Sequence, residues 1–127
     1  MSVEIKTNVI FLVARALEVK DIILPLKFEK ISNPTFEAAK VLDEDGKWGK
    51  AKNYYHSIFE LSGLDDEKVH ALVDLSHDLI NLSRYGRAEE FLRKIPKYCL
   101  EIPDERLRKY YTARLYEKRA WIKDYEG

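Results

Sequence analysis

Apolar residues recur three and four positions apart along most of this chain, a spacing typical of amphipathic helices. The clearest stretch lies between Val69 and Leu82, where the apolar side chains form one stripe. The same pattern predicts helices over residues 33–43, 47–61, 64–82, 88–99 and 103–125. Residues 9–17 also fit a buried helix, and a second N-terminal helix should start or kink at Pro25. The pattern therefore predicts an all-α protein of about seven helices without strands.

Cap and turn residues set the expected boundaries of these helices. Asn33 followed by Pro34 is a start signal, because Asn caps a helix N-terminus and Pro fits its first turn. Gly46 stands where that helix must stop, because glycine readily adopts the left-handed conformation of a helix end. Pro96 falls inside residues 88–99, so it should kink or shorten that helix.

A pentapeptide that occurs twice organises the helices into units. The segment KWGKA at residues 47–51 returns 37 residues later as RYGRA at residues 84–88. A period of this size indicates stacked two-helix units. We therefore divide the single domain of residues 1–127 into N-terminal helices (1–31), two repeats (32–68 and 69–105) and a C-terminal half repeat (106–127). The correspondence extends to the pairs Ala39/Ser76, Leu42/Leu79, Ala51/Ala88, Tyr54/Phe91 and Ile58/Ile95, and in part to Ala113 and Tyr116.

The residue types at the repeated positions suit a pair of closely packed helices. Two antiparallel helices approach closely only where the facing side chains are small. Small residues occupy these positions on the expected first helices (Ala39, Ser76, Ala113) and second helices (Ala51, Ala88). Trp48 and Tyr85 stand at the turns, where a large ring can pack between successive units.

This pattern resembles the tetratricopeptide repeat (TPR), in which a Gly-x-aromatic-x-x-Ala turn follows a first helix. Residues 46–51 (GKWGKA) fit the turn, and residues 83–88 (SRYGRA) fit it with Ser in place of Gly. The resemblance covers residues 32–127 and implies a TPR-like superhelix of antiparallel helix pairs. The usual TPR period is about 34 residues. We expect the extra residues of this chain at 64–68 and 101–105, between the units.

A second resemblance is to HEPN-type helical domains. Residues 39–46 (AKVLDEDG) with 53–59 (NYYHSIF) are similar to the start of such domains, and residues 119–125 (RAWIKDY) to their end. Some HEPN proteins are RNases that use an Arg-x4-6-His motif. No Arg precedes a His at that spacing here, because all three His lie before Arg84. The resemblance therefore implies a non-catalytic HEPN-like four-helix bundle.

Composition and charge narrow the classes of function. Lys+Arg and Asp+Glu both number 22, and 35% of the residues are charged. Acids outnumber bases 11 to 6 over residues 29–78, and bases outnumber acids 12 to 6 over residues 84–123. Because these bases alternate with Glu at helical spacing, we interpret them as solvated helix faces rather than a surface for an acidic partner. The single cysteine, and the lack of a signal peptide or membrane-spanning run, favour a cytoplasmic protein without a membrane partner.

The groups that carry catalysis in other proteins form no recognised motif here. His70, Asp74 and His77 share a helix face, but the two imidazoles lie about 10 Å apart along the axis, too far to share a metal ion. His56 and Cys99 fit structural packing roles better than catalytic ones. The sequence has no phosphate-binding glycine loop, metal-finger spacing or nucleophile elbow. We therefore expect no enzymatic activity, cofactor or metal.

The TPR resemblance implies that the first helices line a concave groove for a peptide or helix. In that groove Lys40, His77 and Arg114 would form a basic column suited to an acidic or C-terminal peptide. The favoured hypothesis is a non-enzymatic protein–protein interaction module, an adaptor or assembly subunit, in which a partner or a homodimer completes the stack. The alternative is an RNA-binding or RNA-processing accessory protein that uses the basic C-terminal third. The candidate partner-binding residues are Phe36, Lys40, Val73, His77, Ile80, Asn81, Tyr110, Arg114 and Lys118.

Overall fold

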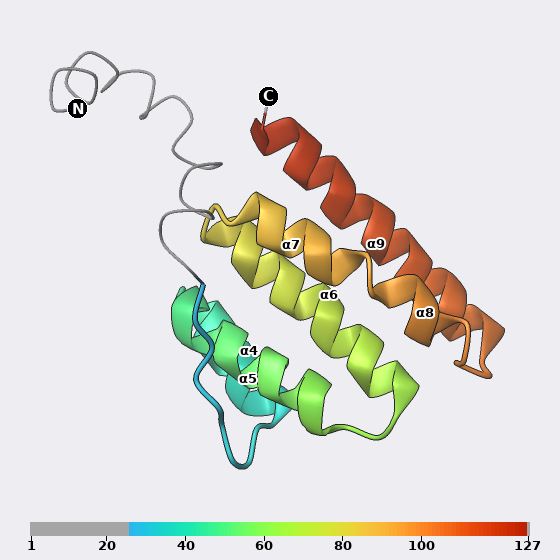
Figure 1. The fold of residues 1–127 in the computed structure, drawn as a ribbon, viewed down its shortest axis with the longest axis horizontal. Helices are drawn as coiled ribbons and strands as arrows, with labels where there is room; N and C mark the ends of the chain where they lie inside the picture. Colours follow the sequence, from blue (N-terminus) through green and yellow to red (C-terminus); the bar gives the residue numbers. More distant parts are fainter. Residues whose placement is uncertain (1–25, 127) are drawn as a thin grey trace, which may run out of the picture.

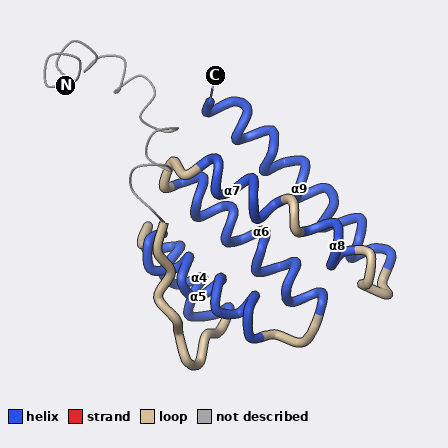
Figure 2. The backbone as a smooth tube through the Cα atoms, in the orientation of Figure 1, coloured by secondary structure: helices blue, strands red, loops and turns tan. Residues whose placement is uncertain are grey.

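The computed structural model describes residues 26–126, and all regular structure in that part of the chain is helical (Figures 1 and 2). The all-α class is thereby confirmed for these residues. The helix expected over residues 9–17 and the helix start expected at Pro25 lie outside the described residues. The elements in chain order are α4 (Phe36–Glu44), α5 (Trp48–Leu61), α6 (Asp65–Asn81), α7 (Tyr85–Leu92), α8 (Ile95–Cys99) and α9 (Glu105–Glu126).

The segment before α4 is extended and lies along α5 (Figure 2). The backbone N–H of Glu29 donates to Asn53 Oδ1 (3.1 Å), and that of Ile31 donates to Ser57 Oγ (2.9 Å). Asn53 and Ser57 lie one turn apart on α5, so their spacing matches two alternate residues of an extended chain. The prediction of helices throughout residues 1–31 is therefore wrong for residues 26–31.

The start of α4 also differs from the prediction. Thr35 is the cap, with extended backbone angles (φ −126°, ψ 150°) and a side-chain Oγ1 that accepts from the N–H of Ala38 at 3.1 Å. Asn33 and Pro34 both precede the helix, so Pro34 does not occupy its first turn. Both Asn33 and Thr35 are good capping types, and only Thr35 makes the cap hydrogen bond.

The repeat is visible in the backbone hydrogen bonds of the two helix turns. At the end of α4, Gly46 N–H donates to Asp43 O (2.9 Å) and Lys47 N–H to Leu42 O (2.8 Å). Exactly 37 residues later, after α6, the equivalent bonds run from Ser83 to Ile80 O (2.9 Å) and from Arg84 to Leu79 O (2.7 Å). Gly46 (φ 73°) and Ser83 (φ 62°) both hold left-handed backbone conformations. The two helix pairs therefore close with the same Schellman-type turn, as the sequence repeat predicts.

Small residues lie where the helices of each pair approach. Ala39, Ala51, Ser76 and Ala88 are all fully buried. Ser76 Oγ donates to Leu72 O on its own helix (2.8 Å) and lies 3.4 Å from Ala88 O on α7. Ala113, the third member of the predicted set, is exposed on α9.

The second helix of the second pair is broken into α7 and α8 (Figure 2). α7 ends at Leu92 and α8 begins at Ile95, with Pro96 in its first turn. The predicted effect of Pro96 is confirmed, because proline cannot supply the N–H that a continuous helix needs here.

The core of the domain surrounds α6, which contacts α5, α7, α8 and α9 (Figure 1). Leu72, Leu75 and Leu79 of α6 are completely buried between these neighbours. Because one helix is covered from several directions, few of its side chains remain on the surface. None of the described helices is long and apolar enough to span a membrane.

Candidate functional site

Ionisable side chains from α4, α5, α6 and α9 contact one another in three small groups. Where α5 packs against α4, Tyr55 OH donates to Asp43 Oδ2 at 2.9 Å. The Asp43 and Asp78 carboxyls face each other within hydrogen-bonding reach, and Asp78 is completely buried. Burial, and then the neighbouring Asp43 carboxyl, hold the pKa of Asp78 well above its usual range. At neutral pH the Asp78 carboxyl therefore retains its proton and can donate it to the neighbouring Asp43 carboxyl.

A buried lysine continues this polar cluster on α9. Lys118 Nζ lies 3.1 Å from His77 Nδ1 and 3.4 Å from Glu117 Oε1. The ammonium also stacks on the Trp121 ring, 3.8 Å from its centroid. Burial, and then Lys118, lower the pKa of His77, so its imidazole is neutral and Nδ1 can accept from the ammonium. Burial and the nearby Arg114 lower the pKa of Lys118 itself.

A third group of side chains forms nearer the N-terminal end of α6. His70 Nε2 contacts Asp74 Oδ2 at 3.0 Å, and His70 Nδ1 lies 3.3 Å from Tyr111 OH on α9. The imidazole packs edge-on against Phe36 of α4 at 4.4 Å between ring centroids. This arrangement links α4, α6 and α9 through one side chain. Within residues 26–126, no group of three or more His, Cys, Asp or Glu side chains is arranged to hold a metal ion.

The structure separates the candidate partner-binding residues into two sets. Lys40 and Tyr110 are exposed, and Phe36, His77, Asn81 and Arg114 are half-buried. Val73 and Ile80, in contrast, are 2% and 3% exposed, and Lys118 is completely buried. The expectation that these three side chains are free of the core is wrong, because α6 and α9 pack directly against each other. They cannot contact a partner without rearrangement of the domain.

Several of the accessible residues already contact neighbours in the domain, as Phe36 does with Tyr55 and His70. His77 is joined to Lys118, and Arg114 Nη1 donates to Glu117 Oε1 at 2.7 Å.

The sequence analysis missed the Asp43–Asp78 pair. The sequence does hint at a buried carboxyl, because Asp78 interrupts the apolar stripe of this helix, three positions after Leu75 and four before Leu82.

The two residues assigned structural roles lie as expected. The His56 ring stacks on Phe28 at 3.9 Å and meets the edge of Phe91 at 5.8 Å. Cys99 is buried, with Sγ 3.6 Å from the carbonyl oxygen of Arg108.

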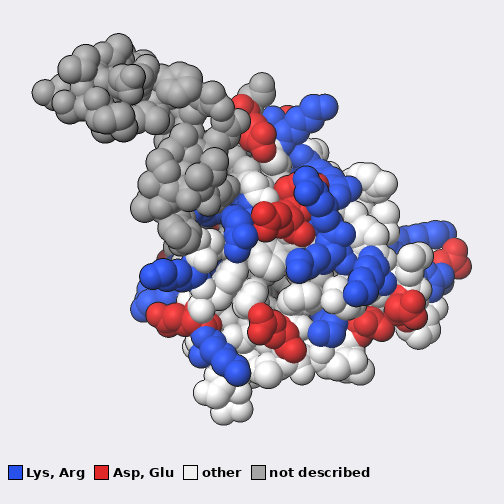
Figure 3. Space-filling model, in the orientation of Figure 1, with Lys and Arg blue, Asp and Glu red and all other residues white. Residues whose placement is uncertain are grey.

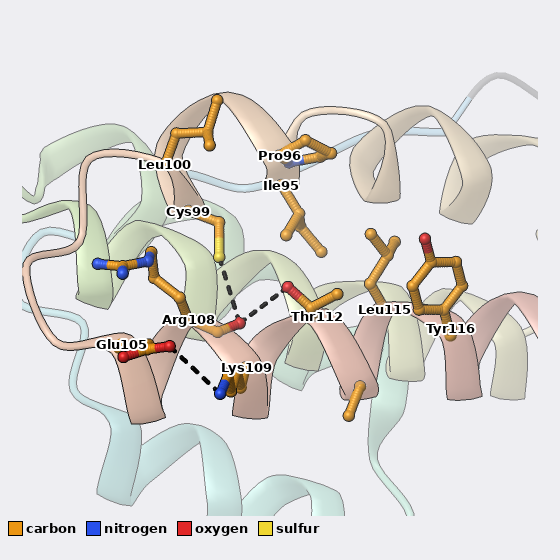
Figure 4. Close-up of a pocket in the computed structure, with 11 residues that line it drawn as sticks. Ile95, Pro96, Cys99, Leu100, Glu105, Arg108, Lys109, Thr112, Leu115 and Tyr116 are labelled. Carbon is orange, nitrogen blue, oxygen red and sulfur yellow. Dashed lines mark hydrogen bonds and ion pairs between the residues drawn. The ribbon is translucent and has the colours of Figure 1, made fainter.

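A second candidate surface is a hollow of about 680 Å³ between α8 and α9 (Figure 4). One wall is formed by Ile95 and Pro96 of α8 and by Leu100, which follows this helix. Thr112, Leu115 and Tyr116 of α9 lie opposite. The charges at its rim are already paired, because Glu105 contacts Lys109 at 3.2 Å and Arg108 donates to backbone carbonyls. The hollow is therefore mainly an apolar surface.

Comparison with known proteins does not assign the chain to a family. The chain matches no protein-family profile, no curated protein sequence and no solved structure.

Proposed function

We propose that the protein is a TPR-like, non-enzymatic module that binds a protein or peptide partner across its first helices. The observation that carries this proposal is the duplicated turn, in which the same backbone hydrogen bonds and the same left-handed residue recur at a 37-residue interval. Structural repeats of this kind build extended binding surfaces rather than enclosed catalytic sites.

The proposed surface consists of the accessible candidates on α4, α6 and α9. Lys40 and Tyr110 are exposed, and Arg114 is half-buried and paired with Glu117 at 2.7 Å. The buried His77–Lys118 and Asp43–Asp78 contacts lie beneath this surface and hold the three helices in register. A peptide with acidic side chains or a free carboxylate fits the exposed groups best.

RNA binding through the basic C-terminal third remains the alternative function. Figure 3 shows basic side chains interspersed with acidic ones on the displayed face. Several bases of this third are engaged in ion pairs, which leaves less positive charge free for phosphates. These pairs are Arg87–Glu90 (2.9 Å), Arg93–Glu89 (3.7 Å), Arg119–Glu89 (3.1 Å) and Lys109–Glu105 (3.2 Å).

The test uses the full chain as bait in native lysate, with washes at low and then high salt. We expect a protein partner that survives high salt and is lost with Lys40→Glu and with Tyr110→Ala. Lys50→Glu is the matched control, because Lys50 is an exposed lysine on α5. A partner retained by both groove variants would refute the proposed surface. Nucleic acid released by salt would instead support the alternative function.

A further inference from the structure

The outward face of α9 is a helix surface without a neighbour in the described domain. The buried stripe of α9 consists of Tyr111, Leu115, Lys118 and Ile122. Residues at helical spacing on the opposite side are all exposed, and Tyr116 is 64% exposed. This outward face comprises Arg106, Lys109, Ala113, Tyr116, Ala120 and Asp124.

The internal repeat shows how an equivalent face is used elsewhere in the domain. Subtracting the 37-residue period from Lys109, Ala113 and Tyr116 gives Leu72, Ser76 and Leu79 of α6. Those three side chains are completely buried, and Ser76 lies against α7. In the first pair, Ala39 of α4 is likewise buried. Each earlier first helix is therefore covered at these positions by a second helix.

Within residues 26–126, α9 is not followed by such a helix. Its position equivalent to Gly46 and Ser83 is Ala120. Gly46 and Ser83 have positive φ and turn the chain, but Ala120 lies inside α9, which continues to Glu126. The third unit thus lacks its second helix within residues 26–126.

We propose that the outward face of α9 pairs with the same face of a second copy of this chain, with the two α9 helices antiparallel. Each copy then supplies the second helix that the other copy's third unit lacks. A two-fold interface uses one surface twice, so this surface must carry both a projecting side chain and a site that receives it. The exposed Tyr116 ring is the projection, and exposed Ala113 leaves room for it.

The charges flanking this face fit the same register. The register places Ala113 opposite the second copy's Tyr116. Glu105 then lies alongside the second copy's Lys123. On the other flank, Arg106 lies alongside the second copy's Asp124. In antiparallel helix pairs, residues on one flank meet residues on the same flank of the partner helix. Glu105 and Lys123 share one flank, separated by 18 residues or five turns, and Arg106 and Asp124 share the other. All four side chains are exposed, so both flanks bring opposite charges together.

The hollow beside α9 gives the second copy an apolar wall. Leu100, directly after α8, is 78% exposed and lines this hollow together with Pro96 (Figure 4). Because the formal net charge is zero, two copies do not repel each other overall. These features favour a second copy over a charged ligand as the occupant.

The test is the association state of the full chain, measured by analytical ultracentrifugation from about 1 μM to about 500 μM, a range that covers weak specific interfaces. We expect a monomer–dimer equilibrium in this range. Tyr116→Ala should weaken it, because the projecting ring is lost. Lys123→Glu should raise the dissociation constant at least about tenfold, because two attractive pairs become repulsive.

The decisive variant is Glu105→Lys combined with Lys123→Glu, which exchanges the charges and should restore association. Lys50→Glu is the control, because Lys50 is an exposed lysine on α5, outside both proposed surfaces. Circular dichroism checks that each variant remains folded. A monomer throughout the range, a dimer that Tyr116→Ala and Lys123→Glu leave unchanged, or a double variant without recovery would each overturn the proposal. The proposed peptide surface would stand in all of these cases, because Lys40, Tyr110 and Arg114 are not part of the outward face of α9.

Discussion

The replacement Asp78→Asn tests whether Asp78 holds a proton in the folded protein. Asp78 is completely buried and faces Asp43, and its pKa is raised first by burial and then by Asp43. Asp74 raises this pKa further, and Lys118 opposes the rise. In the unfolded chain an aspartic acid has a pKa of about 3.9. Between that value and the raised one, the folded state therefore binds one proton more than the unfolded state.

This difference makes stability fall as pH rises. One extra proton in the folded state lowers the free energy of unfolding by about 1.4 kcal/mol for each pH unit. From about pH 5 to about pH 7 the loss is therefore about 3 kcal/mol, a large share of the ~5–15 kcal/mol of a typical domain. Asn has nearly the same shape, and its amide can donate to Asp43 as the protonated carboxyl does, without binding a proton. We expect Asp78→Asn to remove this loss, so its advantage over wild type grows with pH.

The assay is urea denaturation followed by circular dichroism at several pH values. Burial lowers the pKa values of His56 and His77, which gives an opposite trend near pH 6 as the unfolded chain loses its protons. That trend is common to both proteins, so the difference between them isolates Asp78. Asp124→Asn, at an exposed carboxyl, is the control. A difference between Asp78→Asn and wild type that does not change with pH would refute the proton held by Asp78.

Three further predictions concern the fold, each measured by chemical denaturation. Ser83→Gly should stabilise the protein by about 1 kcal/mol, because Ser83 holds a left-handed backbone conformation (φ 62°) that glycine adopts without strain. Gly46→Ala should destabilise it by about the same amount, although no atom lies within 4 Å of an added Cβ. Small effects of both substitutions would contradict backbone strain at these turns. Thr35→Ala should lower the free energy of unfolding by about 1 kcal/mol and Asn33→Ala should leave it almost unchanged, because only Thr35 caps α4. A larger loss for Asn33→Ala would indicate that Asn33 is the cap. Leu79→Ala should lower the free energy of unfolding by about 3 kcal/mol, because Leu79 is completely buried. Tyr116→Ala, at the equivalent but exposed position of α9, should lower it by under about 1 kcal/mol in dilute monomer. Comparable losses would mean that α9 is covered in the monomer.

Most helices of this protein could be located from the sequence because their causes are local. The apolar stripe between Val69 and Leu82 marks α6, and Pro96 breaks the helix in which it lies. The turn at Gly46 recurs at Ser83 because the surrounding residues recur with it. Each of these features depends on residues within a few turns of one another, so the pattern of the chain suffices to find it.

Features that depend on distant partners were not readable in this way. Residues 26–31 are extended because Asn53 and Ser57, more than twenty residues later, accept their backbone hydrogen bonds. Asp78 carries its proton because the surrounding helices bury it and because α4 brings Asp43 beside it.

The accessible surface likewise depends on tertiary packing. Helical periodicity places Val73, Ile80 and Lys118 on helix faces, but the packing of α6 against α9 buries all three. The sequence alone determined where helices form and where they turn, because those are short-range preferences. Only the tertiary structure decided which polar groups are buried and which surface remains for a partner, because burial is set by helices that are distant in the chain.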